Sequence, residues 1–289
     1  MSDLPAGITV RRMTAADLDA CMALKTLQGW NQLREDWDML LGFCPQACFV
    51  ACSGERLVGT LTAIDYAGRF SWIGMVMVHP EMRRRGIGRS LLTAAIEALA
   101  SCETIKLDAT PAGRPLYAQL GFVDEYELGR LTASQPRWNA VPPEAVAAEP
   151  LRPADLPEVM ALDLPVFGVE RRQVVQAWYE RTPQAACVVR RDGRIAGYAM
   201  GRPGANCALI GPVIATHEAD ACALTAAVGR CFPGQPLGLD MVARHGTFRA
   251  WLESCGFAFQ RPFTRMYRGP NRYPGLPERQ FCVLGPEVG

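Results

Sequence analysis

The sequence lacks several features that would place it in a binding or membrane class. Among its 289 residues, 30 basic side chains stand beside 29 acidic ones, so the chain has no excess charge of one sign with which to attract a nucleic acid. It has no apolar run of about 18 residues, and its first residues lack a basic region followed by an apolar stretch. We therefore expect no nucleic-acid partner, no membrane span and no signal peptide.

Paired cysteines are missing as well. The eleven cysteines stand mostly singly in apolar stretches, with no Cys-x-x-Cys pair and no Cys/His ligand spacing. This pattern is typical of reduced thiols in a core. We expect a cytoplasmic protein that holds no metal.

The segment at residues 75–92 carries the strongest positive signal. An apolar strand runs through Val78 into Arg83-x-x-Gly86-x-Gly88, and an amphipathic helix pattern follows directly. Glycine lets the backbone approach a ligand and adopt positive φ, and the N–H groups of a helix's first turn attract an anion. The spacing predicts a phosphate-binding turn.

Four interpretations of this turn can be compared. A Walker loop ends in Gly-Lys-Ser/Thr and a dinucleotide fingerprint needs a third glycine, but Arg89-Ser90-Leu91 follows Gly88, so neither motif fits. A basic turn that only begins a surface helix is the structural alternative. The segment instead resembles the acyl-CoA pyrophosphate loop of the GCN5-related N-acetyltransferases (GNAT family), which lies between a V-shaped strand and a helix.

The chain also repeats itself at an offset of roughly 135 to 138 residues. Residues 72–76 parallel 209–213, residues 105–108 parallel 237–240, and residues 114–122 parallel 249–257. Each half is therefore one copy of the same α/β unit. The strand and helix patterns of the first copy follow the GNAT order, with expected strands at 8–13, 48–52, 57–66, 70–78, 104–109 and 122–128 and expected helices at 17–27, 33–41, 89–100 and 114–120.

The expected fold class is α/β, with two tandem GNAT-like domains that each have a central mixed, splayed sheet flanked by helices. We expect a catalytic, acyl-CoA-binding first copy at residues 1–131, a Pro-rich linker at 132–149, and a degenerate second copy at 150–289. The apolar alternation at 278–284 could add an edge strand.

The second copy has lost the features that bind a cofactor. Where the first copy has its glycine turn, the second has Ala215-Thr216-His217-Glu218-Ala219-Asp220, whose acidic groups would repel a pyrophosphate. Leu252 replaces Tyr117. We expect acetyl-CoA to bind to the first copy only.

The resemblance implies a set of cofactor-binding residues in the first copy. Strand backbone would pair with pantetheine and hydrogen-bond the thioester oxygen, and the turn and following helix would bind the pyrophosphate. These residues are Val76, Met77, Val78, Arg83, Arg84, Arg85, Gly86, Ile87, Gly88, Arg89 and Ser90.

Two residues are candidates for catalysis. Tyr117 matches the family's Leu-Tyr-x-x-x-Gly-Phe helix, whose tyrosine often protonates the leaving thiolate; the structural alternative is a packing role. Asp108 ends the strand beside the splay and is a candidate base, but it could equally cap a turn. His79 at the loop entrance fits a positional role better, and many family members use a chain of water molecules as base.

Trp30, Asn31 and Gln32 are the candidate acceptor-binding residues. In the family this loop lies over the acceptor channel, and an aromatic ring beside two amides could hold a small polar amine; a glycine-centred helix break with Trp30 in the core explains the segment equally well. The expected function is transfer of an acetyl group from acetyl-CoA to an amine of a small molecule. A non-catalytic acyl-CoA sensor or interaction module and a protein N-acetyltransferase are the alternatives.

Overall fold

A computed structural model describes residues 4, 7–138 and 141–289. The expected first copy and linker include residues 1–3, 5–6 and 139–140, which lie outside the described residues. The first copy contributes, in chain order, β1 (Ile8–Arg12), α1 (Leu18–Leu27), α2 (Arg34–Phe43), β2 (Phe49–Ser53), β3 (Arg56–Tyr66), β4 (Phe70–Val78), α3 (Ile87–Ala98), β5 (Thr104–Ala109), α4 (Arg114–Gln119) and β6 (Val123–Ala133).

The second copy repeats this order. It contributes β7 (Glu149–Pro150), α5 (Leu156–Phe167), α6 (Arg172–Arg181), β8 (Ala186–Arg191), β9 (Arg194–Arg202), β10 (Ala208–Ala215), α7 (Glu218–Arg230), β11 (Leu237–Val242), α8 (Gly246–Ser254), β12 (Ala258–Arg268) and β13 (Gln280–Cys282). In the described part of the chain, no helix is long and apolar enough to cross a membrane.

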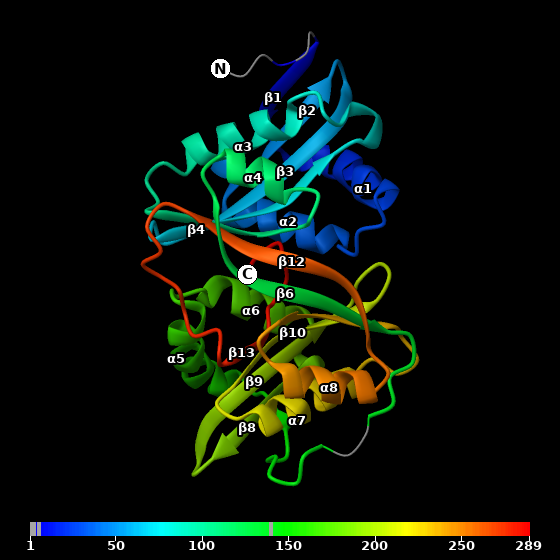
Figure 1. Cartoon of the computed structure of the whole chain (residues 1–289), viewed down its shortest axis with the longest axis vertical. Coiled ribbons are helices and arrows are strands. Elements are labelled where there is room, and N and C mark those ends of the chain that lie inside the picture. The colour runs from blue at the N-terminus through cyan, green and yellow to red at the C-terminus, as the bar shows by residue number, and fades with distance from the viewer. Residues whose placement is uncertain (1–3, 5–6, 139–140) are drawn as a thin grey trace.

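Strand pairing joins the two copies in one sheet. Its order is β1-β2-β3-β4-β5-β12-β6-β11-β13-β10-β9-β8-β7. The corresponding strands β6 and β12 are therefore exchanged between the copies: β12 of the second copy pairs antiparallel with β5, and β6 of the first copy pairs antiparallel with β11. Figure 1 shows β6 and β12 side by side across the middle of the molecule, between the remainders of the two copies.

Helices cover the sheet because its strands are apolar on both faces. Every residue of β10 is buried, and α3 places Ile87, Leu91, Leu92 and Ala95 on its buried face, at helical spacing. A Cβ at Gly59 of β3 would lie only 3.0 Å from the Leu91 side chain, so the helix packs directly on the strand backbone.

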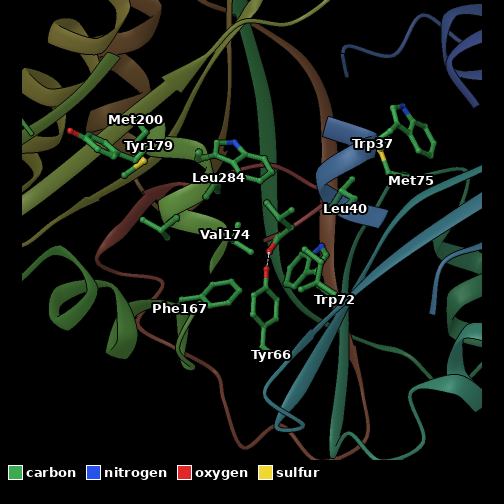
Figure 2. Close-up of a cluster of buried hydrophobic side chains, with 14 of the residues drawn as sticks. Trp37, Leu40, Tyr66, Trp72, Met75, Phe167, Val174, Tyr179, Met200 and Leu284 are labelled. Atoms are coloured by element: carbon green, nitrogen blue, oxygen red, sulfur yellow. Dashed lines mark hydrogen bonds between the residues drawn. The ribbon is translucent and has the colours of Figure 1, made fainter. Parts of the chain in front are cut away.

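The helices α1, α2, α5 and α6 bury their apolar side chains in one cluster that both copies share. Figure 2 shows Tyr66 and Trp72 of the first copy facing Phe167 of the second, and the Tyr66 and Phe167 ring centroids are 5.1 Å apart. The Tyr66 hydroxyl donates a hydrogen bond of 2.7 Å to the Val288 carbonyl. The C-terminal segment, residues 280–289, is thus part of the contact between the copies.

The tail at 278–284 does contain a strand, but the expectation of an edge position is wrong. β13 lies inside the sheet, where Cys282 pairs with Val213 of β10 and with Met241 of β11. Because β10 and β11 correspond to β4 and β5 of the first copy, β13 fills the place where the second copy would open its own splay.

The exchanged strands predict that the two copies unfold together. We expect the whole chain to lose its structure in one cooperative thermal transition, and a chain ending at Leu131 to be unfolded, because it loses β12 from β5 and β11 from β6. Circular dichroism and tryptophan fluorescence of the two chains measure this. Two well-separated transitions would contradict it.

Candidate active site

A bulge in β4 opens the sheet of the first copy. The β3–β4 register shifts between Thr60–Met77 and Thr62–Gly74, and Met75 adopts a left-handed φ of 51°. The Thr60 hydroxyl donates to the Met75 carbonyl at 2.8 Å and holds the bulge. Parallel pairing of β4 with β5 covers Phe70–Trp72. The two strands diverge beyond this stretch, which creates the splay.

The backbone of β4 beyond the bulge faces this opening. His79 N–H donates to the Val58 carbonyl of β3 at 2.8 Å, so by alternation the peptide groups of Val76 and Val78 point to the other side. The Val78 carbonyl accepts long hydrogen bonds of 3.3 Å from the Gln28 and Arg83 side chains. Strand backbone of this kind can pair with an extended ligand.

The predicted phosphate turn has the expected backbone. Gly86 caps α3 with a φ of 81°, and Arg84 has a φ of 58°. A Cβ at Gly88 would lie 3.3 Å from the Leu116 side chain of α4, so the helix start has little room for a side chain there. The first-turn N–H groups of α3 lie beside the exposed side chains of Arg83, Arg84 and Arg85. This turn can hold an anion.

The other predicted cofactor residues adjoin this turn. Met77 and Ile87 are buried, and Arg89 hydrogen-bonds Gln119. The Ser90 hydroxyl donates to the Gly86 carbonyl at 3.2 Å. His79 Nε2 lies 2.8 Å from the Arg56 guanidinium, as suits a residue that positions the loop entrance.

A cavity of about 230 Å³ lies at the mouth of the splay, between the two copies. Its lining brings together six of the residues predicted from the sequence: Val76, Asp108, Tyr117, Trp30, Asn31 and Gln32. The second copy and the tail supply the other wall, with Asn206, Cys207, Gln260, Arg261, Phe263, Pro286 and Glu287. The sequence did not identify these individual residues of the second wall.

Tyr117 lies on α4 with 8% of its surface exposed. Burial raises the pKa of its hydroxyl to about 12, because the apolar surroundings disfavour the phenolate. Its ring packs edge-on against Phe122, with the centroids 6.1 Å apart, and lies directly over the position where Gly113 would carry a Cβ. Tyr117 is therefore a protonated group with a fixed ring in the cavity wall.

Asp108 lines the cavity but has a partner of its own. Its two carboxylate oxygens accept hydrogen bonds of 2.9 and 3.0 Å from Arg265, which lies opposite it on β12. The same pair recurs at the equivalent place in the second copy, where Arg130 on β6 binds both oxygens of Asp240 at 2.7 and 2.6 Å. Each aspartate thus joins its own copy to the strand received from the other.

The loop after α1 reaches across to the second copy. The Asn31 amide donates to the Cys207 carbonyl at 3.0 Å, and its oxygen accepts from the Asn206 and Cys207 N–H groups at 2.8 and 3.1 Å. Gln32 donates to a Glu287 oxygen at 3.3 Å. Trp30 is partly buried against the shared core and still lines the cavity. Asn31 therefore holds the wall together, while Gln32 and Trp30 face the space inside.

Glu287 enters this wall from the tail. Its other oxygen is bound by Arg202, which also donates to Asp36 of α2 at 2.9 Å. A Cβ at Gly74 would lie only 2.7 Å from the Glu287 Cα, so the tail backbone rests on β4 itself. Glu287 carried no motif in the sequence, and only the path of the tail brings it to the site.

The corresponding region of the second copy is filled. β13 lies between β10 and β11, and a Cβ at Gly211 would lie 2.1 Å from the Val283 carbonyl. At the start of α7, Asp220 accepts two hydrogen bonds from Arg191 and one of 2.9 Å from the Val146 N–H of the linker. The tail and the linker thus lie at the positions that correspond to the splay and the glycine turn of the first copy.

Comparisons with known proteins agree with this architecture. Two family models, both described as acetyltransferase (GNAT) domain, match residues 45–124 and 159–282. The uncharacterized N-acetyltransferase YitH of Bacillus subtilis is 26% identical over 210 residues, which cover 72% of this chain and 70% of that protein. A solved acetyltransferase structure from Pyrococcus horikoshii superposes with a TM-score of 0.81 at 21% identity, over 100% of this chain and 99% of that one.

A shorter match is to a protein whose name is that of an N-alpha-acetyltransferase. The Arabidopsis thaliana N-alpha-acetyltransferase MAK3 is 36% identical over 87 residues. This stretch covers 27% of the present chain and 46% of that protein, so the chain spans less than half of this relative.

Proposed function

Because the chain belongs to the GNAT family of acetyltransferases and carries two such domains in tandem, we propose that its first copy moves an acetyl group from acetyl-CoA to the amine of a small molecule. The observation that carries this proposal is the cavity between the copies. It joins the β4 bulge at Val76 to the Tyr117 side chain.

The residues of the first copy fit acetyl-CoA as a substrate. The left-handed Gly86, the close approach at Gly88 and the neighbouring arginines form a cradle for a pyrophosphate. The strand backbone of Val76 and Val78, which faces the splay, suits a pantetheine arm. Acetyl-CoA supplies the acetyl group as an activated thioester, and a backbone N–H of β4 would polarise its carbonyl oxygen.

Tyr117 is the proposed acid. A hydroxyl with a pKa of about 12 stays protonated at neutral pH and can give its proton to a thiolate as the thiolate leaves. We assign removal of the amine's proton to water in the cavity. Both oxygens of Asp108 are bound by Arg265, so we give Asp108 a structural role in place of the expected role as base.

Asp108→Ala tests that structural role. We expect it to lower the free energy of unfolding by about 3–5 kcal/mol, because it leaves the buried Arg265 without its partner. Urea denaturation measures the change, and the pair Asp108→Leu with Arg265→Met should recover much of it. A stable Asp108→Ala protein that has lost turnover, together with the acidic limb of its pH profile, would restore Asp108 as the base.

The cavity size favours a small acceptor over a polypeptide. About 230 Å³, enclosed by the Gln28–Gln32 loop, β12 and the tail, suits a compact molecule. The resemblance to an N-alpha-acetyltransferase supports a protein N-terminus as the second candidate. The eleven free cysteines support a cytoplasmic location.

A screen tests the proposal. Purified protein with acetyl-CoA is offered a library of small amines and N-terminal peptides, and thiol release is recorded. We expect release that depends on a small amine. Release with peptides alone would favour the second candidate, and tight binding of acetyl-CoA with no release above hydrolysis would favour a sensor.

A further inference from the structure

The cavity wall contains four charged side chains, and three of them are neutralised by bound partners. Asp108 is paired with Arg265, Arg130 with Asp240, and Glu287 with Arg202. These pairs are buried, so their charges are compensated inside the protein. They hold the wall in place and leave little charge for a ligand.

Arg261 is the fourth, and it is different. It comes from β12 of the second copy, and its guanidinium packs over the Phe263 ring at 4.8 Å. Within the described part of the chain, its Nε is buried without a hydrogen-bond partner, and no carboxylate forms an ion pair with it. Both carboxylate oxygens of the nearby Asp240 accept hydrogen bonds from Arg130. Burial, and after it the nearby Arg130 guanidinium, lowers the pKa of Arg261, because both disfavour its charged form.

Gln32 of the first copy contributes a hydrogen-bond acceptor, whereas Arg261 is a donor. It is 6% exposed, and its Nε2 donates to the carboxylate of Glu287, which fixes the orientation of the amide. Its Oε1 is then left buried without a hydrogen-bond partner among the described residues. The cavity therefore holds one unpaired acceptor and one unpaired cationic donor.

Each of these atoms needs a partner, because a buried polar group without a hydrogen bond destabilises the protein. The loop that carries Gln32 is tied to the β4 backbone, since Gln28 donates to the Val78 carbonyl. Gln32 thus lies on the side of the expected thioester, and an amine N–H can pair with its Oε1. Arg261 lies on the wall from the other copy, where an anion can pair with its guanidinium.

We infer that the acceptor is an amine that also carries an anionic group, a carboxylate or a phosphate, and that Arg261 binds this group. The inference rests on the proposed function and specifies its substrate class. A cavity of about 230 Å³ has room for a chain of a few carbons between the two charged ends. Arg261 is then a specificity-determining residue that the second copy supplies to the first.

Matched pairs of amines test this inference. The ω-amino acids of two to six carbons are each compared with the n-alkylamine of the same length, and O-phosphoethanolamine is compared with ethanolamine. Thiol release from acetyl-CoA gives kcat/KM, and saturation-transfer NMR reports binding of the same compounds. The variants are Arg261→Met, Arg261→Lys and, as a matched control, Arg249→Met, which removes an exposed arginine that also lies over a phenylalanine ring.

We expect the wild-type protein to prefer the anionic member of at least one pair by tenfold or more. Arg261→Met should lower kcat/KM for that compound by about 10- to 100-fold and leave its neutral partner almost unchanged. Arg261→Lys should be intermediate, and Arg249→Met should have no effect. A preference for the carboxylate series or for the phosphate identifies the anion.

The possible failures are distinct. If amines are acetylated but Arg261→Met affects anionic and neutral members equally, this inference is wrong and the proposed function stands. If anionic amines bind in an Arg261-dependent way but no thiol is released, the anion site stands and the proposed function is wrong. If the anionic compounds show neither binding nor turnover, the inference is wrong.

Discussion

Tyr117→Phe should lower kcat by about ten- to a thousand-fold and leave the affinity for acetyl-CoA nearly unchanged. The substitution removes one oxygen from a side chain whose ring is held between Gly113 and Phe122, so the wall of the cavity keeps its shape. What is lost is the proton donor for the thiolate. Steady-state kinetics with an identified acceptor, together with calorimetric titration of acetyl-CoA, measure the two quantities.

Tyr179→Phe is the matched control. This tyrosine of the second copy is equally buried, and its hydroxyl donates a weak hydrogen bond of 3.4 Å to the Leu151 carbonyl. We expect its loss to change kcat less than twofold, as is usual for a remote substitution. If Tyr117→Phe keeps full turnover when the chemical step limits the rate, Tyr117 serves packing alone.

Gly86→Glu combined with Gly88→Glu should weaken acetyl-CoA binding by about 100-fold or more. At Gly86 a side chain is strained by the left-handed backbone, and at Gly88 it meets Leu116. Both new carboxylates would also repel the pyrophosphate at the start of α3. Calorimetry measures the affinity, and circular dichroism checks that the fold is kept.

Thr216→Glu supplies the control for charge alone. Thr216 is exposed just before α7, so this variant places a carboxylate near the start of the corresponding helix in the second copy. We expect its acetyl-CoA affinity to match that of the unmodified protein. Equal loss in both variants would mean that the glycine turn is not the specific binding element.

Single helices, strands and turns of this protein could be predicted because each is specified by the pattern of a short stretch of sequence. The apolar periods placed α3 and β4 to within two residues at most of their ends, and the glycine spacing placed the turn between them. The family resemblance then supplied Tyr117, Trp30 and Gln32, which the structure brings to one cavity. Each of these residues lies in a short stretch of sequence that resembles a family motif.

The long-range part of the structure could not be predicted in the same way. Alternating apolar residues show that β6 and β12 are strands, but either could pair with β5, and the repeat makes the two choices equivalent in pattern. The partner of Asp108 was hidden for that reason, since Arg265 reaches it only through the exchange. Glu287 and Arg261 were missed because the second wall depends on the same exchange and on the path of the tail.

The number of acetyl-CoA molecules bound per chain tests the central claim, that one site in the first copy works while the second is filled by β13 and Asp220. Isothermal titration calorimetry of the full chain, with the Gly86→Glu, Gly88→Glu variant beside it, gives this number. We expect one molecule per chain for the unmodified protein and, for the variant, binding that is weaker by about 100-fold or more. Two equivalent molecules per chain, or one that the variant still binds with unchanged affinity, would contradict it.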